Sequence, residues 1–222
     1  MWPHPQEIVW TVVVAGGSGA RFGGAKQYAD IGGQRMLDRS VDVAVGCSAG
    51  VVAVVPAADV SSESAVLGAR GAVTVAGGST RSESVRAGLA AVPADATIVC
   101  VHDAARPFAT SELFAAVVAA VAAGADGAVP GVPVADTIKV IDADRRVVDT
   151  PERASLVAVQ TPQAFRAAAL RAAHERGGEG TDDAALVERA GGVVVVVDGL
   201  AGNRKVTHPD DLAWARERAG AR

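Results

Sequence analysis

A glycine-rich stretch near the start of the chain contains the residue types that hold phosphate groups. Residues 12–26 read VVVAGGSGARFGGAK, so a run of valines leads into a loop with several glycines and two cations. Glycine lets a backbone turn sharply and point several N–H groups at one anion, and basic side chains add positive charge around it. The loop therefore predicts a polyphosphate site. Its candidate residues are Gly16, Gly17, Gly19, Arg21 and Lys26.

Two familiar phosphate-binding motifs do not match this loop. A dinucleotide fingerprint needs Gly-x-Gly-x-x-Gly, but counting from Gly17 the sixth residue is Phe22. A P-loop needs Gly-Lys-Ser/Thr, whereas Lys26 stands between Ala25 and Gln27. Taken alone, the loop fits a plain β-to-α turn with solvated cations as well as it fits a phosphate site. The choice depends on the other motifs of the chain.

Length and composition indicate one globular domain over residues 1–222. The chain has a formal net charge of −4, and aromatic residues make up only 4% of it. A general nucleic-acid binder would be basic and would offer aromatic side chains for stacking, so no nucleic-acid partner is expected. Cys47 and Cys100 lie far apart in apolar surroundings and are expected to be buried and unpaired.

Targeting signals are also missing from the pattern of the sequence. No apolar run approaches the ~20 residues that span a membrane. The first residues, MWPHPQE, lack the basic segment and apolar core of a secretory leader. We therefore expect a cytoplasmic protein with no membrane partner.

The order of the elements predicts an α/β fold, Rossmann-like and doubly wound, with a mostly parallel sheet. Short β-branched runs alternate with helical patterns, and such alternation builds parallel sheets through right-handed crossovers. The predicted strands are residues 12–14, 50–55, 72–75, 96–101, 127–133 and 193–197, the last of them buried. The predicted helices include residues 36–44, 58–69, 80–91, 111–123 and 182–190.

The alternation breaks between residues 135 and 161, where a hairpin is predicted instead. Residues 137–141 and 146–149 form two short strands around the turn 142–145. An isolated hairpin needs a partner, so we expect a projecting arm over about residues 135–161 that makes a homodimer contact. After the arm, Thr161 and Pro162 are typical of a helix start, as N-cap and first helical residue.

Two more loops follow predicted strands and carry polar residues. Residues 102–107 read HDAARP at the end of a buried strand, and ligands bind at the carboxyl ends of strands in open α/β sheets. Residues 76–85 read AGGSTRSESV, a second glycine turn in which Thr80 and Glu83 form a capping box. Both loops supply candidate ligand contacts.

Read in order, the chain contains AGGSGARF, AKQYADIGGQRML, AGGSTRSESV, VHDAARPF, ADTIK, VQTPQAF, TDDAALVE and GNRKVTHPDDL. This ordered set resembles the cytidylyltransferases that act on sugar-alcohol phosphates, most closely the 2-C-methyl-D-erythritol 4-phosphate cytidylyltransferases of the non-mevalonate isoprenoid pathway. The resemblance runs from about residue 12 to residue 212. It implies CTP and a sugar-alcohol phosphate as substrates, Mg²⁺ as the usual divalent metal, release of pyrophosphate, and a homodimer whose arms complete each other's sites.

The resemblance also implies a role for individual residues. The triphosphate positions are Ala15, Gly16, Gly17, Gly19, Arg21 and Lys26. The positions around the cytosine are Gly78, Ser79, Arg81 and Ser84. The ribose and metal region is Asp103 and Ala104. The acceptor positions are Arg106, Thr181 and Lys205, with Thr137 and Arg153 coming from the arm of the other subunit.

The implied reaction brings two anions together. An acceptor phosphate oxygen attacks the α-phosphorus of CTP in line and pyrophosphate leaves, so positioning and fixed cations supply most of the rate. We expect Arg21, Lys26 and Lys205 to carry catalysis, and Asp103 to orient Mg²⁺ directly or through water. A phosphate dianion needs no general base, so His102 is interpreted as a hydrogen-bonded support of its loop.

Several candidates also fit ordinary structural roles. Thr181 suits a helix N-cap as well as a ligand contact. Asp182 and Asp183 are interpreted as first-turn helix acids. Thr137 and Arg153 on the hairpin suit solvated side chains as well as substrate contacts.

Three other functions compete with the main interpretation. The same chemistry on ribitol 5-phosphate is the nearest, because related enzymes share the Ala-Gly-Gly start. A dehydrogenase is disfavoured by the failed fingerprint and by Pro56, which stands where an acidic residue would end the second strand. A non-catalytic nucleotide-binding homologue is the third, and the joint presence of Arg21, Lys26, Asp103 and Lys205 argues against it.

Overall fold

The computed structural model describes residues 7–17 and 24–220. Strand β1 (Val9–Val14) is an inner strand of the sheet, which pairs in parallel with β2 (Gly50–Val55) on one side and β4 (Ile98–Asp103) on the other. Val12 and Val13 are fully buried, as a β-branched strand covered on both faces requires. The register sets Val14 opposite Asp103, so the glycine loop and the HDAARP loop leave the same edge of the sheet.

The main sheet is mostly parallel, which confirms the predicted Rossmann-like, doubly wound α/β class. Its order is β10-β5-β9-β4-β1-β2-β3, with β8 paired to β5. β9 is antiparallel to both of its neighbours, and β8 is antiparallel to β5. The remaining strands of this sheet are β3 (Ala72–Ala76), β5 (Gly127–Pro133), β8 (Val157–Val159), β9 (Gln163–Arg166) and β10 (Val194–Asp198).

The helix predicted to start at Thr161 and Pro162 was wrong. The chain instead enters β9, and helix α5 begins only at Ala167. Ala164 and Phe165 are fully buried between β4 and β5, where their backbone groups complete the sheet. Central sheet pairing and burial outweigh a local capping signal, because the signal itself contributes only about 1 kcal/mol.

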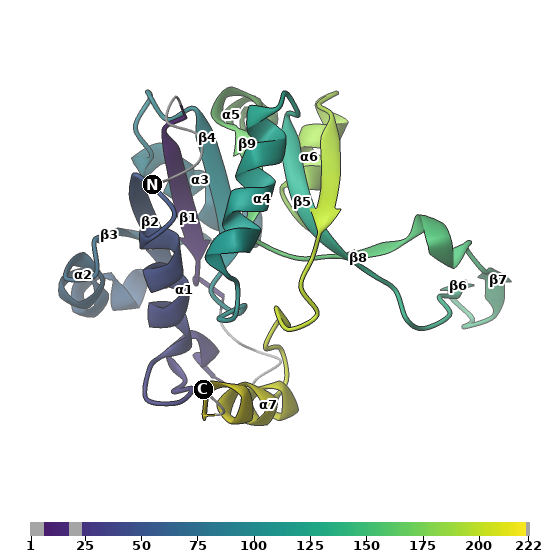
Figure 1. Cartoon of the computed structure of the whole chain (residues 1–222), viewed down its shortest axis with the longest axis horizontal. Helices are drawn as coiled ribbons and strands as arrows, with labels where there is room; N and C mark the ends of the chain where they lie inside the picture. The colour runs from purple at the N-terminus through teal and green to yellow at the C-terminus, as the bar shows by residue number, and fades with distance from the viewer. Residues whose placement is uncertain (1–6, 18–23, 221–222) are drawn as a thin grey trace.

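Helices cover both faces of the sheet (Figure 1). On one face α1, α2 and α4 bury residues such as Leu37, Leu67 and Phe114, and on the other α3, α5 and α6 bury residues such as Val85 and Leu170. The helices are α1 (Met36–Val45), α2 (Val60–Gly68), α3 (Arg81–Ala91), α4 (Ser111–Ala122), α5 (Ala167–Glu175), α6 (Ala184–Arg189) and α7 (Pro209–Gly220). Short 3₁₀ turns span Lys26–Tyr28, Ala57–Asp59 and Arg153–Ser155.

Helix α7 packs below the carboxyl edge of the sheet, over a small apolar cluster of its own (Figure 1). Ile31, Met36 and Val206 are fully buried in this cluster together with Ala215 of the helix. The segment just before α7 carries Lys205, so this packing fixes the backbone from which that lysine extends.

Strand β10 is less buried than predicted. Val193 is 63% exposed and Val196 is 54% exposed. The strand lies at the edge of the sheet, where β5 is its only partner among the described strands, so part of it faces solvent. A run of valines does not by itself distinguish a central strand from an edge strand.

The predicted hairpin is present and projects from the body (Figure 1). It consists of β6 (Val140–Ile141) paired antiparallel with β7 (Val147–Asp149). The valines of β7 are exposed, Val147 by 58% and Val148 by 60%. The dimer role of this arm and the single-domain interpretation stay predictions.

Two smaller expectations concern cysteines and membranes. Cys47 and Cys100 are buried and form no disulfide, which confirms the prediction. Among the helices of residues 7–17 and 24–220, none combines the length and the apolar character needed to cross a membrane.

Gly88 fixes how closely α3 approaches the sheet. A Cβ added there would overlap Val12 Cγ1 and would lie 3.0 Å from Val54 Cγ2. Gly88→Ala is therefore expected to lower the free energy of unfolding by about 1–3 kcal/mol, the usual cost of overpacking. Gly68→Ala is the matched control, because its Cβ would meet nothing within 4 Å, and it should leave stability unchanged or raise it by up to ~1 kcal/mol. Urea unfolding of both variants measures this, and equal effects would contradict the packing interpretation.

Candidate functional site

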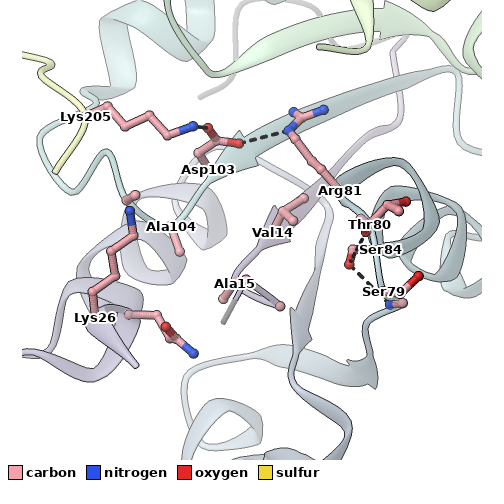
Figure 2. A pocket seen from close by; sticks show the side chains of 15 residues that line it. Val14, Ala15, Lys26, Ser79, Thr80, Arg81, Ser84, Asp103, Ala104 and Lys205 are labelled. Carbon is pink, nitrogen blue, oxygen red and sulfur yellow. Dashed lines mark hydrogen bonds and ion pairs between the residues drawn. The ribbon is translucent and has the colours of Figure 1, made fainter. Parts of the chain in front are cut away.

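A cavity of about 470 Å³ opens at the carboxyl ends of β1 and β4. Ligand sites in open α/β sheets lie at this edge. The wall is built from the glycine loop, the start of α3, the HDAARP loop and the segment before α7 (Figure 2). Its lining residues include Ala15, Gly16, Gly17, Lys26, Gly78, Ser79, Arg81, Ser84, Asp103, Ala104 and Lys205. Most residues predicted for CTP therefore surround one cavity.

The first glycine loop contributes Ala15, Gly16 and Gly17 to this wall. A Cβ on Gly16 would lie 3.1 Å from Ser84 Oγ, so the loop passes close to the start of α3 and a side chain would have to be accommodated there. Lys26 lies on the far side of the loop, and its Nζ donates to the Val206 carbonyl at 2.7 Å. Gly19 and Arg21, also predicted for the triphosphate, lie outside the described residues.

The second glycine turn is held in shape by its own helix. Thr80 and Glu83 form the predicted capping box at the N-terminus of α3. Ser84 Oγ accepts from the Gly78 N–H at 3.2 Å and donates to the Thr80 carbonyl at 3.0 Å. Ser79 donates through its N–H and its hydroxyl to Glu83, and these bonds lower the pKa of the Glu83 carboxyl. The turn therefore presents small residues in a fixed conformation.

Three ion-paired side chains, Arg81, Asp103 and Lys205, line one wall of the cavity. Asp103 accepts from Lys205 Nζ at 2.5 Å and lies 3.4 Å from Arg81 Nε, as Figure 2 shows. Burial raises the pKa of the Asp103 carboxyl, but the positive charges of Arg81 and Lys205 outweigh burial and hold that pKa well below its usual range. Asp103 therefore stays ionised at any pH at which the protein works.

A second cavity of about 260 Å³ adjoins the first. It is lined by two predicted acceptor residues, Arg106 and Thr181, and it shares Arg81, Asp103 and Lys205 with the first cavity. These three ion-paired side chains thus form a common wall between the cavities. A group transferred from a ligand in one cavity to a ligand in the other would pass this wall.

Arg106 is held by backbone carbonyls rather than by a carboxylate. Its guanidinium donates to Asn203 O at 2.8 Å and to Val159 O at 3.2 Å. Burial lowers the pKa of Arg106. Because its bonds go to neutral carbonyls, its charge remains available for an anion in the second cavity.

Sequence reasoning missed two residues, Thr161 and Asn203, that hold Asp103 in place behind the common wall of the cavities. Thr161 Oγ1 accepts from the Asp103 N–H at 3.0 Å and shares a hydrogen bond with His102 Nδ1, also at 3.0 Å. Asn203 Nδ2 donates to the Thr161 carbonyl at 2.8 Å, and both residues are buried. The sequence does not mark Thr161 as a support for Asp103, because a threonine before a proline is also typical of a helix start. His102 has the predicted supporting geometry.

Burial of His102 gives the protein a pH-dependent stability. The His102 ring is fully buried, and burial lowers its pKa to about 4. The unfolded chain takes up this proton near pH 6.5, so the stability from neutral His102 is complete above that pH and is lost as the pH falls toward 4. We expect a loss of about 2 kcal/mol between pH 7 and pH 5.

The matched variant is His102→Gln, which keeps an acceptor for Thr161 but has no charge to gain. Urea unfolding at the two pH values should show a shallower loss in this variant than in the wild type. Equal losses in the two proteins would assign the pH dependence to other groups.

The two neighbouring acids before α6 have different roles, and the prediction that both lie in its first turn was wrong, because the helix begins only at Ala184. Asp182 precedes the helix and accepts from the Ala185 N–H at 3.0 Å. Asp183 is instead fully buried and pairs with Arg81 NH1 at 2.8 Å. Nothing in the Asp-Asp sequence distinguishes the two, because the difference depends on which one faces the interior.

One family of known proteins matches nearly the whole chain. The family model described as IspD, 2-C-methyl-D-erythritol 4-phosphate cytidylyltransferase, matches residues 9–218. The chain belongs to this IspD family. The resemblance carried by the ordered motifs is thereby confirmed.

Individual relatives agree with this assignment. The 2-C-methyl-D-erythritol 4-phosphate cytidylyltransferase of Rhodococcus opacus is 47% identical over 214 residues, which is 94% of this chain and 93% of the relative. The bifunctional enzyme IspD/IspF of Clavibacter michiganensis subsp. michiganensis is 47% identical over 93% of this chain, but the chain spans only 53% of that relative. The structure of 4-diphosphocytidyl-2C-methyl-D-erythritolsynthase from Anaerococcus prevotii superposes with a TM-score of 0.84 at 28% identity, covering 96% of this chain and 98% of that one.

Two predicted acceptor residues lie away from both cavities of this IspD-family chain. Thr137 and Arg153 belong to the arm and line neither cavity. Both are exposed, and Arg153 NH1 donates to the Ala135 carbonyl within the arm at 2.8 Å. The chain therefore does not bring them to its own site, and any contact with substrate requires a second subunit.

IspD-family nucleotidyltransferases generally use a divalent metal, and the donor set here fits one. Within the described residues there is no cluster of three His, Cys, Asp or Glu side chains that would form a protein cage. Asp103 is the one carboxylate among the described residues that line the first cavity. A cation bound through one carboxylate, with its other ligands from phosphates and water, suits this arrangement.

Proposed function

We propose that the protein transfers CMP from CTP to 2-C-methyl-D-erythritol 4-phosphate, giving 4-diphosphocytidyl-2-C-methyl-D-erythritol and pyrophosphate. The observation that carries the proposal is the pair of adjoining cavities whose common wall is Arg81, Asp103 and Lys205. One cavity has the features of a nucleoside triphosphate site, and the other has those of a small phosphate site. The relatives named for this reaction match over nearly the whole chain.

The first cavity suits CTP. Its fixed turn of Gly78, Ser79 and Ser84 offers backbone groups and small side chains to a pyrimidine. The loop at Gly16 and Gly17, with Lys26 beside it, receives the triphosphate. Gly19 and Arg21 belong to the same loop and complete this part of the proposal.

The second cavity suits the phosphate of the acceptor. Arg106 offers a planar fork of donors that matches a phosphate, and Thr181 offers a hydroxyl. Lys205 lines both cavities, so its Nζ reaches a phosphate on either side of the wall. The acceptor phosphate then lies next to the α-phosphate of CTP.

In this mechanism an oxygen of the acceptor phosphate attacks the α-phosphorus, and the bond to the β-phosphate oxygen breaks. Lys205 and Arg81 reduce the repulsion between the two anions and stabilise charge on the α-phosphate oxygens, while Lys26 and Arg21 stabilise the pyrophosphate that leaves. Asp103 would hold Mg²⁺, which when bound neutralises the triphosphate oxygens and the leaving group. No general base is needed, because the nucleophile is already an anion.

A pyrophosphate-release assay tests the substrates. Each of the four nucleoside triphosphates is combined with 2-C-methyl-D-erythritol 4-phosphate or with ribitol 5-phosphate, with and without Mg²⁺. We expect release with CTP, methylerythritol phosphate and Mg²⁺ together. Preference for ribitol 5-phosphate would overturn the acceptor, and no release with any combination would overturn the activity.

The exposed arm supports a homodimer in which each arm reaches the other subunit's site. Thr137 and Arg153 would then contact the acceptor bound by the partner subunit, and the exposed valines Val147 and Val148 of β7 would be covered. Light scattering at micromolar concentration tests the oligomeric state, and a monomer would contradict this arrangement.

Mixing two inactive variants tests whether the sites are shared. Lys205→Ala inactivates the site of the subunit that carries it. Arg153→Ala instead inactivates the site of the partner subunit, which the altered arm reaches. In a mixed dimer, the Arg153→Ala subunit keeps Lys205 and receives an intact arm, so one wild-type site is restored. Denaturing and refolding the two variants together should recover about a quarter of wild-type activity, from random pairing in a two-fold dimer. A mixture no more active than the separate variants would show that the arm does not complete a partner's site.

A further inference from the structure

Asp183 is a buried carboxylate that the proposed reaction does not use directly. It has no exposed surface, and it occupies the N-cap position of α6 without capping the helix through its side chain. Its two oxygens have separate partners. Oδ2 accepts from Arg81 NH1 at 2.8 Å, and Oδ1 accepts from His174 Nε2 at 2.9 Å. A buried carboxylate with both oxygens engaged is costly to place and strongly oriented.

The Arg81 guanidinium is shared between two carboxylates. Its bond to Asp183 is 2.8 Å long, whereas its Nε lies 3.4 Å from Asp103 Oδ1. Asp183 is therefore the closer partner and sets where the guanidinium lies. Arg81 therefore makes only one long hydrogen bond to Asp103, and the other oxygen of Asp103 accepts from Lys205.

We propose that Asp183 is a positioning residue for nucleotidyl transfer, which acts by holding Arg81 at the wall between the two cavities. This inference rests on the proposed function. Without the Asp183 carboxylate, Arg81 is free to direct two nitrogens at Asp103 and form the bidentate pair that arginine and carboxylate prefer. That pair would draw Asp103 away from Lys205 and would remove a cation from the place where the two phosphates meet.

His174 provides the second attachment of Asp183. It lies in the last turn of α5, is 4% exposed, and bonds Asp183 through Nε2. The order of contacts is therefore His174, Asp183, Arg81, Asp103 and Lys205, from α5 to the segment before α7. Neither Asp183 nor His174 lines the cavities that they influence.

Asp183→Asn is the direct test, because asparagine has the same size without the charge. We expect kcat for pyrophosphate release to fall by about 10- to 100-fold, as for other residues that orient a functional side chain. KM for CTP should stay within about threefold, because the proposed contacts of Gly78, Ser79 and Ser84 with the base, and of the first glycine loop with the triphosphate, do not pass through Asp183. Asp38→Asn is the matched control. Asp38 is a buried carboxylate paired with Arg35 and Arg70 that lines neither cavity, so its loss should lower stability without lowering kcat.

A double-mutant cycle separates positioning from a general loss of structure. In an Arg81→Met background the guanidinium is gone, so adding Asp183→Asn should change kcat by no more than about twofold. A second loss as large as the first would overturn the proposal, and so would a single Asp183→Asn variant with normal kcat. An inactive wild type would instead refute the proposed function and leave the cycle without a signal to compare.

The His174 pair keeps the inference testable if Asp183→Asn does not fold. His174→Gln retains a donor for Asp183 and should keep most of the kcat, whereas His174→Leu removes the donor and should lower it. Equal kcat values in these two variants would contradict a role that passes through Asp183.

Discussion

Replacing Lys205 with methionine is expected to lower kcat for pyrophosphate release by at least about 100-fold. Lys205 lines both cavities and contacts Asp103, so its charge lies where the acceptor phosphate approaches the α-phosphate of CTP. A single well-placed donor to developing charge contributes about 10²–10³ in turnover. Methionine keeps the length and apolar part of the side chain, so the change reports mainly on the charge. Steady-state kinetics with both substrates saturating measures it.

Arg204→Met is the control for this variant. Arg204 is the neighbouring cation, but its side chain is 51% exposed, pairs with Asp211 and stacks on Trp214, and it lines neither cavity. We expect its kcat to stay close to that of the wild type. Similar losses in the two variants would mean that local charge, rather than the position of Lys205 at the common wall, controls the rate.

Lys26→Met is expected to lower kcat by a similar factor, at least about 100-fold, for a different reason. Lys26 stands beside the glycine loop at the opposite end of the first cavity from Arg81 (Figure 2). In the proposed reaction its charge would therefore act on the β- and γ-phosphates and on the pyrophosphate that leaves. Lys26→Arg keeps a charge there and should recover part of the activity. A Lys26→Met enzyme that is folded, as judged by thermal unfolding, and retains near-normal kcat would remove this lysine from the mechanism.

The parts of the site that could be predicted are those in which the residue types and their spacing are typical of only a few local structures. Glycines after a buried valine run predicted a loop at the end of β1, where Gly16 and Gly17 line the first cavity, and Thr80 with Glu83 predicted the capping box that shapes the second turn. Asp103 at the end of a buried strand was placed correctly because parallel strands bring their carboxyl ends to one edge. Local signals sufficed at these positions because the local structure determines the geometry.

Other parts could not be predicted because they depend on contacts between distant segments. The Thr161 hydroxyl supports Asp103, 58 positions earlier, and Asp183 reaches Arg81 across 102 positions. A capping signal at Thr161 was overridden by central sheet pairing in β9, and a valine run at β10 did not reveal an edge strand. Tertiary pairing decides such cases, and a single sequence does not show it.

The most direct test follows the α-phosphorus itself. CTP labelled with ³²P at the α-position is incubated with the protein, Mg²⁺ and 2-C-methyl-D-erythritol 4-phosphate, and the products are separated by chromatography. We expect the label to move into a cytidine diphospho-sugar alcohol, with one pyrophosphate formed for each label transferred and the pyrophosphate itself unlabelled. Label released as free CMP, with the acceptor unchanged, would contradict nucleotidyl transfer between the two cavities.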